Sequence, residues 1–366
     1  MQAFQQQILP IAAGADSPHR LQSRILRRKD RLHGGHNRIL GSCPVYNLPF
    51  MSATAPPIEA LVVRVDARQC EVRLRGEVVP ARMRGRLFEE RSEDKVPVAV
   101  GDQVLLSEDG DGLAIETIQP RRNLFARRAA GEEIRRQPLA ANVDQIVVVS
   151  CFGYPPFSSI TTDRILVAAS FHQIPAAIVL NKIDRGKKKT IDAIHRTYQQ
   201  AGYPVYLTSA TKEQGISELR NLLRDRTSVV YGLSGAGKST LINLVQPGLS
   251  LKTGNVSKSL KSGRHTTTFA RLYELEMGGA VVDTPGVRVF RPYGIPPHEL
   301  RLHFPEWKLA SEPCRFHSCT HREEPDCQIR ALVEAGQLAE SRYRSYQQVL
   351  QELEEIYGGT GRREPH

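Results

Sequence analysis

The sequence has 366 residues, of which 40% are hydrophobic and 24% charged, and its formal net charge is +11. These values are typical of a soluble globular protein, and the length predicts two or three domains. No apolar run reaches the roughly 18 to 20 residues of a membrane span, so we expect no membrane-embedded protein.

Residues 1–57 show neither a helical nor a strand period, and they end in Ala-Pro-Pro. Residues 1–50 contain seven Lys and Arg but only two Asp, so much of the positive charge lies there. We expect a disordered or wrongly assigned extension, with Met51 as a plausible true start. The alternative is an organelle transit peptide, because such peptides are rich in Arg and poor in acidic residues.

Residues 58–120 contain five short segments that alternate or run apolar between turn residues. These predicted strands cover 61–65, 70–75, 81–87, 98–106 and 112–118. Five strands in about sixty residues predict a small closed barrel, for which the OB-fold is the first candidate and an SH3-like packing module the alternative. Asp and Glu outnumber Lys and Arg in this segment. Any contact with RNA must therefore come from one face of the barrel.

Residues 121–141 are predicted to form a basic linker, because six arginines lie there against two glutamates. After it, residues 142–302 alternate apolar strands with helical stretches. The strands are predicted at 143–149, 176–180, 204–207, 228–231 and 280–282. This alternation predicts a doubly wound α/β sheet, in which ligands bind at the carboxyl ends of the strands.

The first chemical motif, an N-K-x-D sequence, follows the strand 176–180. It consists of Asn181, Lys182, Ile183 and Asp184. A carboxylate at Asp184 would accept hydrogen bonds from N1–H and the amino group of guanine, and adenine cannot supply this pair of donors. Asn181 would contact the base edge or hold the neighbouring phosphate loop, and the Lys182 stem would lie along the base. After the next strand, Ser209 and Ala210 are expected to offer a backbone N–H to guanine O6.

The second motif is a phosphate-binding loop of the form G-x-x-x-x-G-K-[ST] between a strand and an apolar helix. Its residues are Gly232, Leu233, Ser234, Gly235, Ala236, Gly237, Lys238, Ser239 and Thr240. Backbone N–H groups in such a loop surround the β-phosphate at the start of a helix. Lys238 would reach the β and γ oxygens, and the Ser239 hydroxyl would bind Mg²⁺.

The third motif is the D-x-x-G sequence from Asp283 to Gly286. Asp283 would bind Mg²⁺ through water, and the Gly286 N–H would sense the γ-phosphate. Val287 follows, where many GTPases place a glutamine that orients the attacking water, so we expect slow hydrolysis by the isolated chain. The Arg-His-Thr-Thr-Thr sequence at 264–268 lies where the first switch loop belongs. One of the three threonines in this sequence would complete the Mg²⁺ shell, and His265 could orient the water, although a histidine in such a loop is often only solvated.

The order of these motifs is rotated. An ordinary GTPase has the phosphate loop first, D-x-x-G second and N-K-x-D last, whereas here N-K-x-D comes about fifty residues before the phosphate loop. Circular permutation of one compact domain produces such an order. The sequence therefore predicts a permuted domain that binds and hydrolyses GTP.

The carboxyl-terminal residues 303–366 are predicted to be helical and to contain a metal site. Cys314, Cys319, His321 and Cys327 supply three thiolates and one imidazole, the ligand set of a structural zinc site. His317 is a competing ligand, and reduced cysteines without a metal are the alternative. The crowding of three of the six cysteines here favours a reducing compartment over a disulfide framework.

The order of barrel, permuted GTPase domain and Cys₃His helical tail resembles the ribosome small subunit-dependent GTPase family (RsgA, also called YjeQ or YloQ). The resemblance covers residues 58–357 and includes the Leu-Ala-Ala-Asn-Val-Asp-Gln sequence that starts at Leu139. It implies a maturation factor that binds the small ribosomal subunit and its rRNA late in assembly. We expect this factor to act in the cytoplasm, and nothing in the sequence indicates more than a monomer. Subunit-stimulated GTP hydrolysis would drive its release. The resemblance also assigns the hydrolytic histidine to His265 and the switch threonine to Thr267.

Two other functions remain open at this point. One is a permuted GTPase that acts on the large subunit, and the other is a non-catalytic RNA-binding scaffold with a structural nucleotide site. The barrel before the GTPase domain and the metal site behind it disfavour the first. The complete set of nucleotide motifs disfavours the second.

Overall fold

The computed structural model describes residues 58–66, 69–110, 112–131, 133–249, 251, 270–284 and 289–357. The predicted extension 1–57 lies outside these ranges, as do the switch residues 264–268 and the segment 285–288. Expectations about those segments therefore stay predictions.

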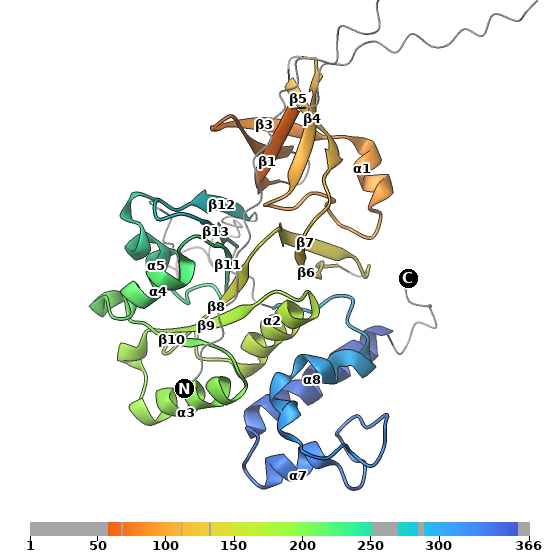
Figure 1. Cartoon of the computed structure of the whole chain (residues 1–366), viewed down its shortest axis with the longest axis vertical. Helices are drawn as coiled ribbons and strands as arrows, with labels where there is room; N and C mark the ends of the chain where they lie inside the picture. Colours follow the sequence, from red (N-terminus) through yellow and green to blue (C-terminus); the bar gives the residue numbers. More distant parts are fainter. Residues whose placement is uncertain are drawn as a thin grey trace, which may run out of the picture. The chain divides into compact units, whose positions relative to one another are not determined.

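The first domain is a closed five-stranded barrel (Figure 1). Its elements are β1 (Ile58–Val65), β2 (Gln69–Leu74), β3 (Glu77–Met83), α1 (Gly85–Glu90), β4 (Gln103–Asp109) and β5 (Gly112–Ile118). The strand order is β1-β2-β3-β5-β4, and β4 pairs with β1 to close the barrel. β3 and β5 run parallel, and the other pairs are antiparallel. The predicted OB-fold barrel is confirmed.

One barrel strand begins later than the sequence predicts. The run 98–106 was expected to form a single strand, but β4 starts at Gln103. Gly101 interrupts the run, because its φ is +91° and a Cβ there would lie 2.2 Å from the carbonyl oxygen of Ala141. A backbone turn that only glycine tolerates therefore separates Val98–Val100 from the strand.

The segment expected to be a basic linker contains two strands. β6 (Leu124–Arg128) and β7 (Arg136–Ala141) form an antiparallel pair. Phe125 and Ala140 are opposite one another in this pair and both are fully buried. The arginine content is typical of a basic linker, but the apolar residues between the arginines pack this segment onto the core.

The α/β domain is a six-stranded portion of sheet with helices on both faces (Figure 1). Its strands are β8 (Gln145–Cys151), β9 (Ala176–Asn181), β10 (Val205–Leu207), β11 (Thr227–Tyr231), β12 (Arg271–Glu274) and β13 (Ala280–Asp283). They lie in the order β10-β9-β8-β11-β13-β12, and all are parallel except β12. The helices are α2 (Ser159–Phe171), α3 (Lys188–Gln200), α4 (Ile216–Leu223) and α5 (Lys238–Val245).

Short 3-10 turns follow two of these strands and one helix. They are η2 (Ile183–Arg185) after β9, η3 (Ala210–Lys212) after β10 and η4 (Pro247–Leu249) after α5. Two apolar clusters hold the helices: one includes residues of α2 and α3, and the other includes residues of α4 and α5. The parallel strands place the carboxyl ends of β9, β10, β11 and β13 at one edge, where the predicted motifs begin.

The carboxyl-terminal region is helical, as predicted. It contains η5 (Pro297–His303), η6 (Pro305–Leu309), α7 (Gln328–Glu334) and α8 (Glu340–Tyr357). α8 packs against α2 of the α/β domain, and its buried face includes Tyr346, Val349 and Leu353. Within the described ranges, every helix is too short or too polar to span a bilayer.

Candidate functional site

The phosphate loop connects β11 to the start of α5, as its motif predicts. Gly232 follows Tyr231, the last residue of β11, and Lys238 is the first residue of α5. The Lys238 side chain is buried and its ammonium donates to the carbonyl oxygens of Gly232 (2.9 Å) and Leu233 (3.2 Å). The loop therefore curls around its own lysine, as loops of this motif do when they surround a phosphate group.

Asn181 ties the base-reading loop to the phosphate loop. Its Nδ2 donates to the carbonyl oxygen of Ala236 at 2.9 Å, and its Oδ1 accepts from the Thr208 hydroxyl at 3.2 Å. Gly237 makes this approach possible, because its φ is +97° and a Cβ there would lie 2.3 Å from Asn181 Nδ2. Of the two roles expected for Asn181, the structure has the one that holds the loops together.

Lys182 makes a second connection between the same loops. It has a left-handed backbone conformation, with φ of 58°. Its ammonium donates to the carbonyl oxygens of Gly235 (2.6 Å) and Tyr154 (2.7 Å). These anchors fix the direction of the lysine stem beside Asp184. The contact to Tyr154 involves only a backbone carbonyl, so no side-chain pattern in the sequence indicates it.

Asp184 lies in η2, where Ser209 holds its carboxylate. The Ser209 hydroxyl donates to Asp184 Oδ1, and this bond lowers the pKa of the Asp184 carboxyl. Ile183 N–H donates to the carbonyl oxygen of Thr208 at 3.2 Å, which joins the loops after β9 and β10. Ser209 N–H already donates to Gln214 at 3.1 Å. Of the two backbone N–H groups expected to serve a ligand, the one at Ala210 is therefore the better placed.

Asp283 ends β13 at the same edge of the sheet. Its Oδ1 is buried without a hydrogen-bond partner among the described residues. Burial raises the pKa of Asp283 and lowers the pKa of Lys238, and each charge opposes the shift of the other. The Thr284 hydroxyl donates to the carbonyl oxygen of Val230 at 3.0 Å, which fixes the exit from the strand. Gly286, Val287, His265 and Thr267 lie outside the described residues.

A magnesium ion fits this donor set. The unpartnered oxygen of Asp283 is a hard ligand, and Ser239 stands one residue after Lys238 in the first turn of α5. Mg²⁺ binds proteins through one or two such oxygen groups and takes its remaining ligands from phosphates and water.

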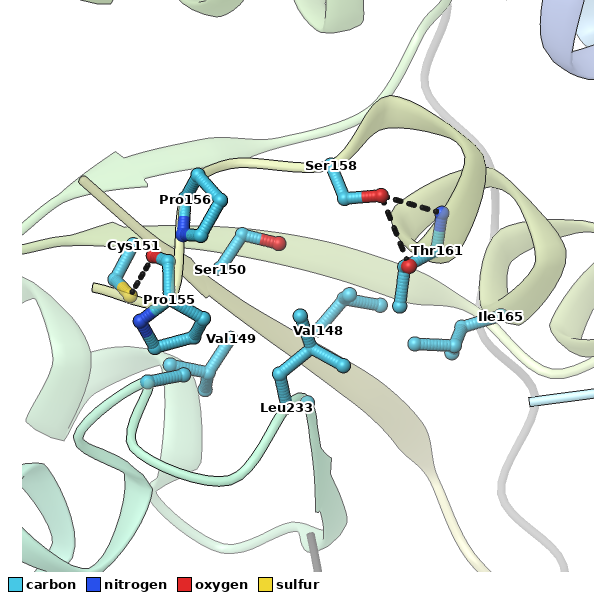
Figure 2. A pocket seen from close by; sticks show the side chains of 12 residues that line it. Val148, Val149, Ser150, Cys151, Pro155, Pro156, Ser158, Thr161, Ile165 and Leu233 are labelled. Carbon is cyan, nitrogen blue, oxygen red and sulfur yellow. Dashed lines mark hydrogen bonds between the residues drawn. The ribbon is translucent and has the colours of Figure 1, made fainter. Parts of the chain in front are cut away.

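A small pocket separates the phosphate loop from α2 (Figure 2). Gly232, Leu233 and Ala236 line it on one side, and the start of α2 lines it on the other. Ser158 caps α2 by accepting from Thr161 N–H at 3.4 Å. The Cys151 thiol donates to the Pro155 carbonyl at 3.2 Å, and burial raises the pKa of this thiol. This thiol is therefore held protonated beside the loop.

The structure brings all four predicted metal ligands together. One ligand atom from each of Cys314, Cys319, His321 and Cys327 lies within 4.8 Å of the others. His321 Nδ1 is 3.5 Å from Cys314 Sγ and 3.4 Å from Cys327 Sγ. Nitrogen and sulfur ligands of one tetrahedral zinc ion would lie about 3.6 Å apart, so the donor set fits zinc. His317 is not part of the cluster.

The environment of the cluster suits metal ligation. Burial lowers the pKa of His321 to about 4, so its imidazole is neutral, as a ligand must be. The backbone carbonyl of the same residue accepts from the Tyr343 hydroxyl at 2.6 Å. The cluster can hold a metal ion and fasten the loop 314–327 to α8.

Most of the linker arginines already have partners. Arg121 pairs with buried Asp102 at 2.7 Å, Arg122 pairs with Asp144 at 2.7 Å, and Arg136 pairs with Asp94 at 2.5 Å. Arg127 and Arg128 are half-buried. The linker therefore presents less free positive charge than its composition suggests.

The family model, the similar sequences and the similar structures all indicate the same protein family. A model of the RsgA GTPase family matches residues 118–292. A protein named "Small ribosomal subunit biogenesis GTPase RsgA" from Flavobacterium johnsoniae is 36% identical over 290 residues, which are 77% of this chain and 89% of that protein. The crystal structure of YjeQ from Thermotoga maritima has a TM-score of 0.62 and 32% identity, over 84% of this chain and 100% of that one. The structure of YloQ, described as a circularly permuted GTPase, has a TM-score of 0.58 and 29% identity, over 85% and 99%.

Proposed function

Because this chain belongs to the RsgA GTPase family, we propose that it hydrolyses GTP to GDP and phosphate in the late assembly of the small ribosomal subunit. The observation that carries the proposal is the joined pair of loops at the strand ends. Asn181 and Lys182 hold the phosphate loop through the carbonyl oxygens of Ala236 and Gly235. A base reader and a phosphate cradle fastened in this way suit a single guanine nucleotide.

The guanine end of the site rests on Asp184. An ionised carboxylate accepts from two donors on the base, and the Ser209 hydroxyl keeps it oriented. The Ala210 N–H would donate to guanine O6. A base that offers one acceptor in place of these donors would leave the carboxylate unsatisfied, which costs about 1 to 3 kcal/mol or more for a charged group.

The phosphate end uses Lys238, the N–H groups of residues 232–240 and the magnesium ligands Ser239 and Asp283. Magnesium bound there supplies positive charge to the β and γ oxygens. Thr267 completes its ligand shell and Gly286 senses the γ-phosphate. Both assignments rest on sequence position.

Hydrolysis by the isolated chain should be slow, because Val287 cannot orient a water molecule. His265 is the side chain assigned to that role. An external partner that completes a GTPase site can raise the rate on the order of 10³ to 10⁵. The small subunit is that partner here, and hydrolysis on it drives release.

The remaining assignments follow from the same framework. Zinc holds the Cys₃His cluster as a structural ion, and the domains are an OB-fold (58–120), a linker (121–141), a permuted GTPase domain (142–302) and a zinc-binding tail (303–366). The chain acts in the cytoplasm as a monomer, bound to the rRNA of the small subunit.

The test is GTP turnover by the purified chain alone, with small subunits and with large subunits. We expect strong stimulation by small subunits only. His265→Ala should lose that stimulation and keep its nucleotide affinity. Stimulation by large subunits would favour the alternative GTPase, and GTP binding without turnover under all three conditions would favour the scaffold.

A further inference from the structure

The segment that follows the base reader is strongly basic. Residues 185–212 contain six Lys and Arg against a single Asp. Five of these cations are exposed, and we call them together the α3 basic surface: Arg185, Lys187, Lys188, Lys189 and Lys212. Arg185 and Lys212 both lie close enough to Asp184 to affect its charge. The group therefore borders the guanine-reading edge.

The three consecutive lysines of this surface have no internal partner in the described part of the chain. No carboxylate there lies within 4.0 Å of the ammonium groups of Lys187, Lys188 and Lys189. The linker arginines differ, because Arg121, Arg122 and Arg136 are each paired with a carboxylate. Among the described residues of this domain, the start of α3 therefore carries three consecutive cations that no carboxylate neutralises.

These lysines do not stabilise the helix on which they lie. Lys187 occupies the capping position without a side-chain cap, and the first turn contains no acidic residue. Cations at the amino end of a helix are opposed by its dipole, at about 0.3 to 1 kcal/mol each when exposed. Helix stability therefore gives no reason for the lysines, whereas attraction to an external anion does.

The composition of the surface favours a nucleic-acid partner. None of the large hydrophobic side chains that are exposed in the described residues lies between 183 and 212. Protein interfaces use aromatic and other apolar anchors and are depleted of lysine, whereas phosphate backbones are bound by Lys and Arg.

We infer that the α3 basic surface binds the phosphate backbone of an rRNA helix on the small subunit. This inference rests on the proposed function and deepens it by naming a contact surface. The barrel, in which acidic residues outnumber basic ones, is not required to carry the whole RNA contact. A phosphate backbone held here lies next to the loop that reads guanine.

The test uses the full chain, loaded with a non-hydrolysable GTP analogue, and purified small subunits at several salt concentrations. The variant is Lys187→Gln/Lys188→Gln/Lys189→Gln. The log–log salt slope of binding should become shallower by about 1 per lysine, and so by about 3. GTP affinity should stay unchanged, and α3 should not lose stability, because the removed charges oppose its dipole.

Two control variants sharpen the result. Lys187→Arg/Lys188→Arg/Lys189→Arg keeps the charge and should keep the slope. Lys95→Gln/Arg224→Gln/Lys308→Gln removes the same charge at scattered exposed positions and should change the slope far less.

If the Lys95→Gln/Arg224→Gln/Lys308→Gln variant shows an equal decrease in the salt slope, the effect comes from overall charge and the inference is wrong. An unchanged slope in the α3 variant while the parent chain binds would also overturn the inference. If the α3 variant loses subunit binding but binds a naked rRNA helix as the parent does, the partner is a ribosomal protein and the inference also fails. Failure of the parent chain to bind small subunits would instead refute the proposed function.

Discussion

Replacing Arg342 should detach the helical tail from the GTPase domain. The side chain of Arg342 is buried, and its guanidinium donates to Glu306 at 2.6 and 3.0 Å and to Asp163 of α2 at 2.5 Å. It also lies 4.7 Å from the ring centroid of Phe304. Both carboxylates are buried as well. Removing one partner from such a group leaves uncompensated buried charge, which costs about 3 to 5 kcal/mol.

The assay can follow the tail alone. Trp307 is the only tryptophan, and it stacks on Phe304 in the tail core with ring centroids 5.2 Å apart. Urea unfolding followed by its fluorescence therefore reports this region. Arg342→Met should lower the unfolding free energy by about 3 to 5 kcal/mol at pH 8. The control is Arg344→Met on the same helix, whose exposed pair with Glu340 is worth about 0.5 kcal/mol or less.

The pH dependence provides a second readout. Burial raises the pKa of Asp163, and Arg342 is the strongest opposing influence. Without the arginine the folded-state pKa rises further above the unfolded value. A group shifted in this direction is most favourable to folding at low pH, so the deficit of Arg342→Met should shrink between pH 8 and pH 5. A deficit that equals that of Arg344→Met, or that does not change with pH, would refute the reasoning.

Three further predictions concern the nucleotide, the metal and a buried histidine. Asp184→Asn replaces an acceptor oxygen with a donor, so it should weaken GTP binding by at least tenfold and favour xanthosine triphosphate; unchanged GTP affinity in a titration would remove the base-reading assignment. Elemental analysis of the reduced protein should find about one zinc per chain, and Cys319→Ser should lose it while GTP binding survives. Burial lowers the pKa of His172 to about 4, whereas the pKa is about 6.5 in the unfolded chain. The neutral imidazole therefore makes its full contribution to the free energy of unfolding above pH 6.5, and about 3 kcal/mol of that free energy is lost as the pH falls toward 4. His172→Phe should flatten the stability profile in that window, and an unchanged profile would contradict this.

The nucleotide motifs could be predicted because each needs fixed residue types at fixed spacing after a strand. The structure places Asn181, Lys238 and Asp283 at one edge of the sheet as the parallel order requires. The Cys₃His metal site could also be predicted, because its four candidate ligands lie within fourteen residues of sequence.

Other features of the structure are not indicated by any short sequence pattern. Arg342 and Asp163 occupy charged positions on helices, where a sequence suggests solvent, and they meet across 179 residues of chain. The alternative roles of Asn181 could be separated only once the position of Ala236 was known. The β6–β7 pair could not be predicted, because the many arginines of this segment are typical of a linker. Its burial depends instead on Phe125 and Ala140.

The core has a consequence for cooperativity. A single apolar cluster runs from Val63 and Val100 of the barrel through Phe125 and Ala140 of the β6–β7 pair to Val282 in β13. Domains usually fold as separate units when few contacts cross their boundary. A cut after residue 120 would divide this cluster and expose apolar surface on both fragments, although the interior of the barrel forms a separate cluster that would stay whole. In native-state hydrogen exchange, β1 of the barrel should therefore open together with the strands β8, β9, β11 and β13 that share this cluster, and so this edge of the barrel should act as part of their folding unit.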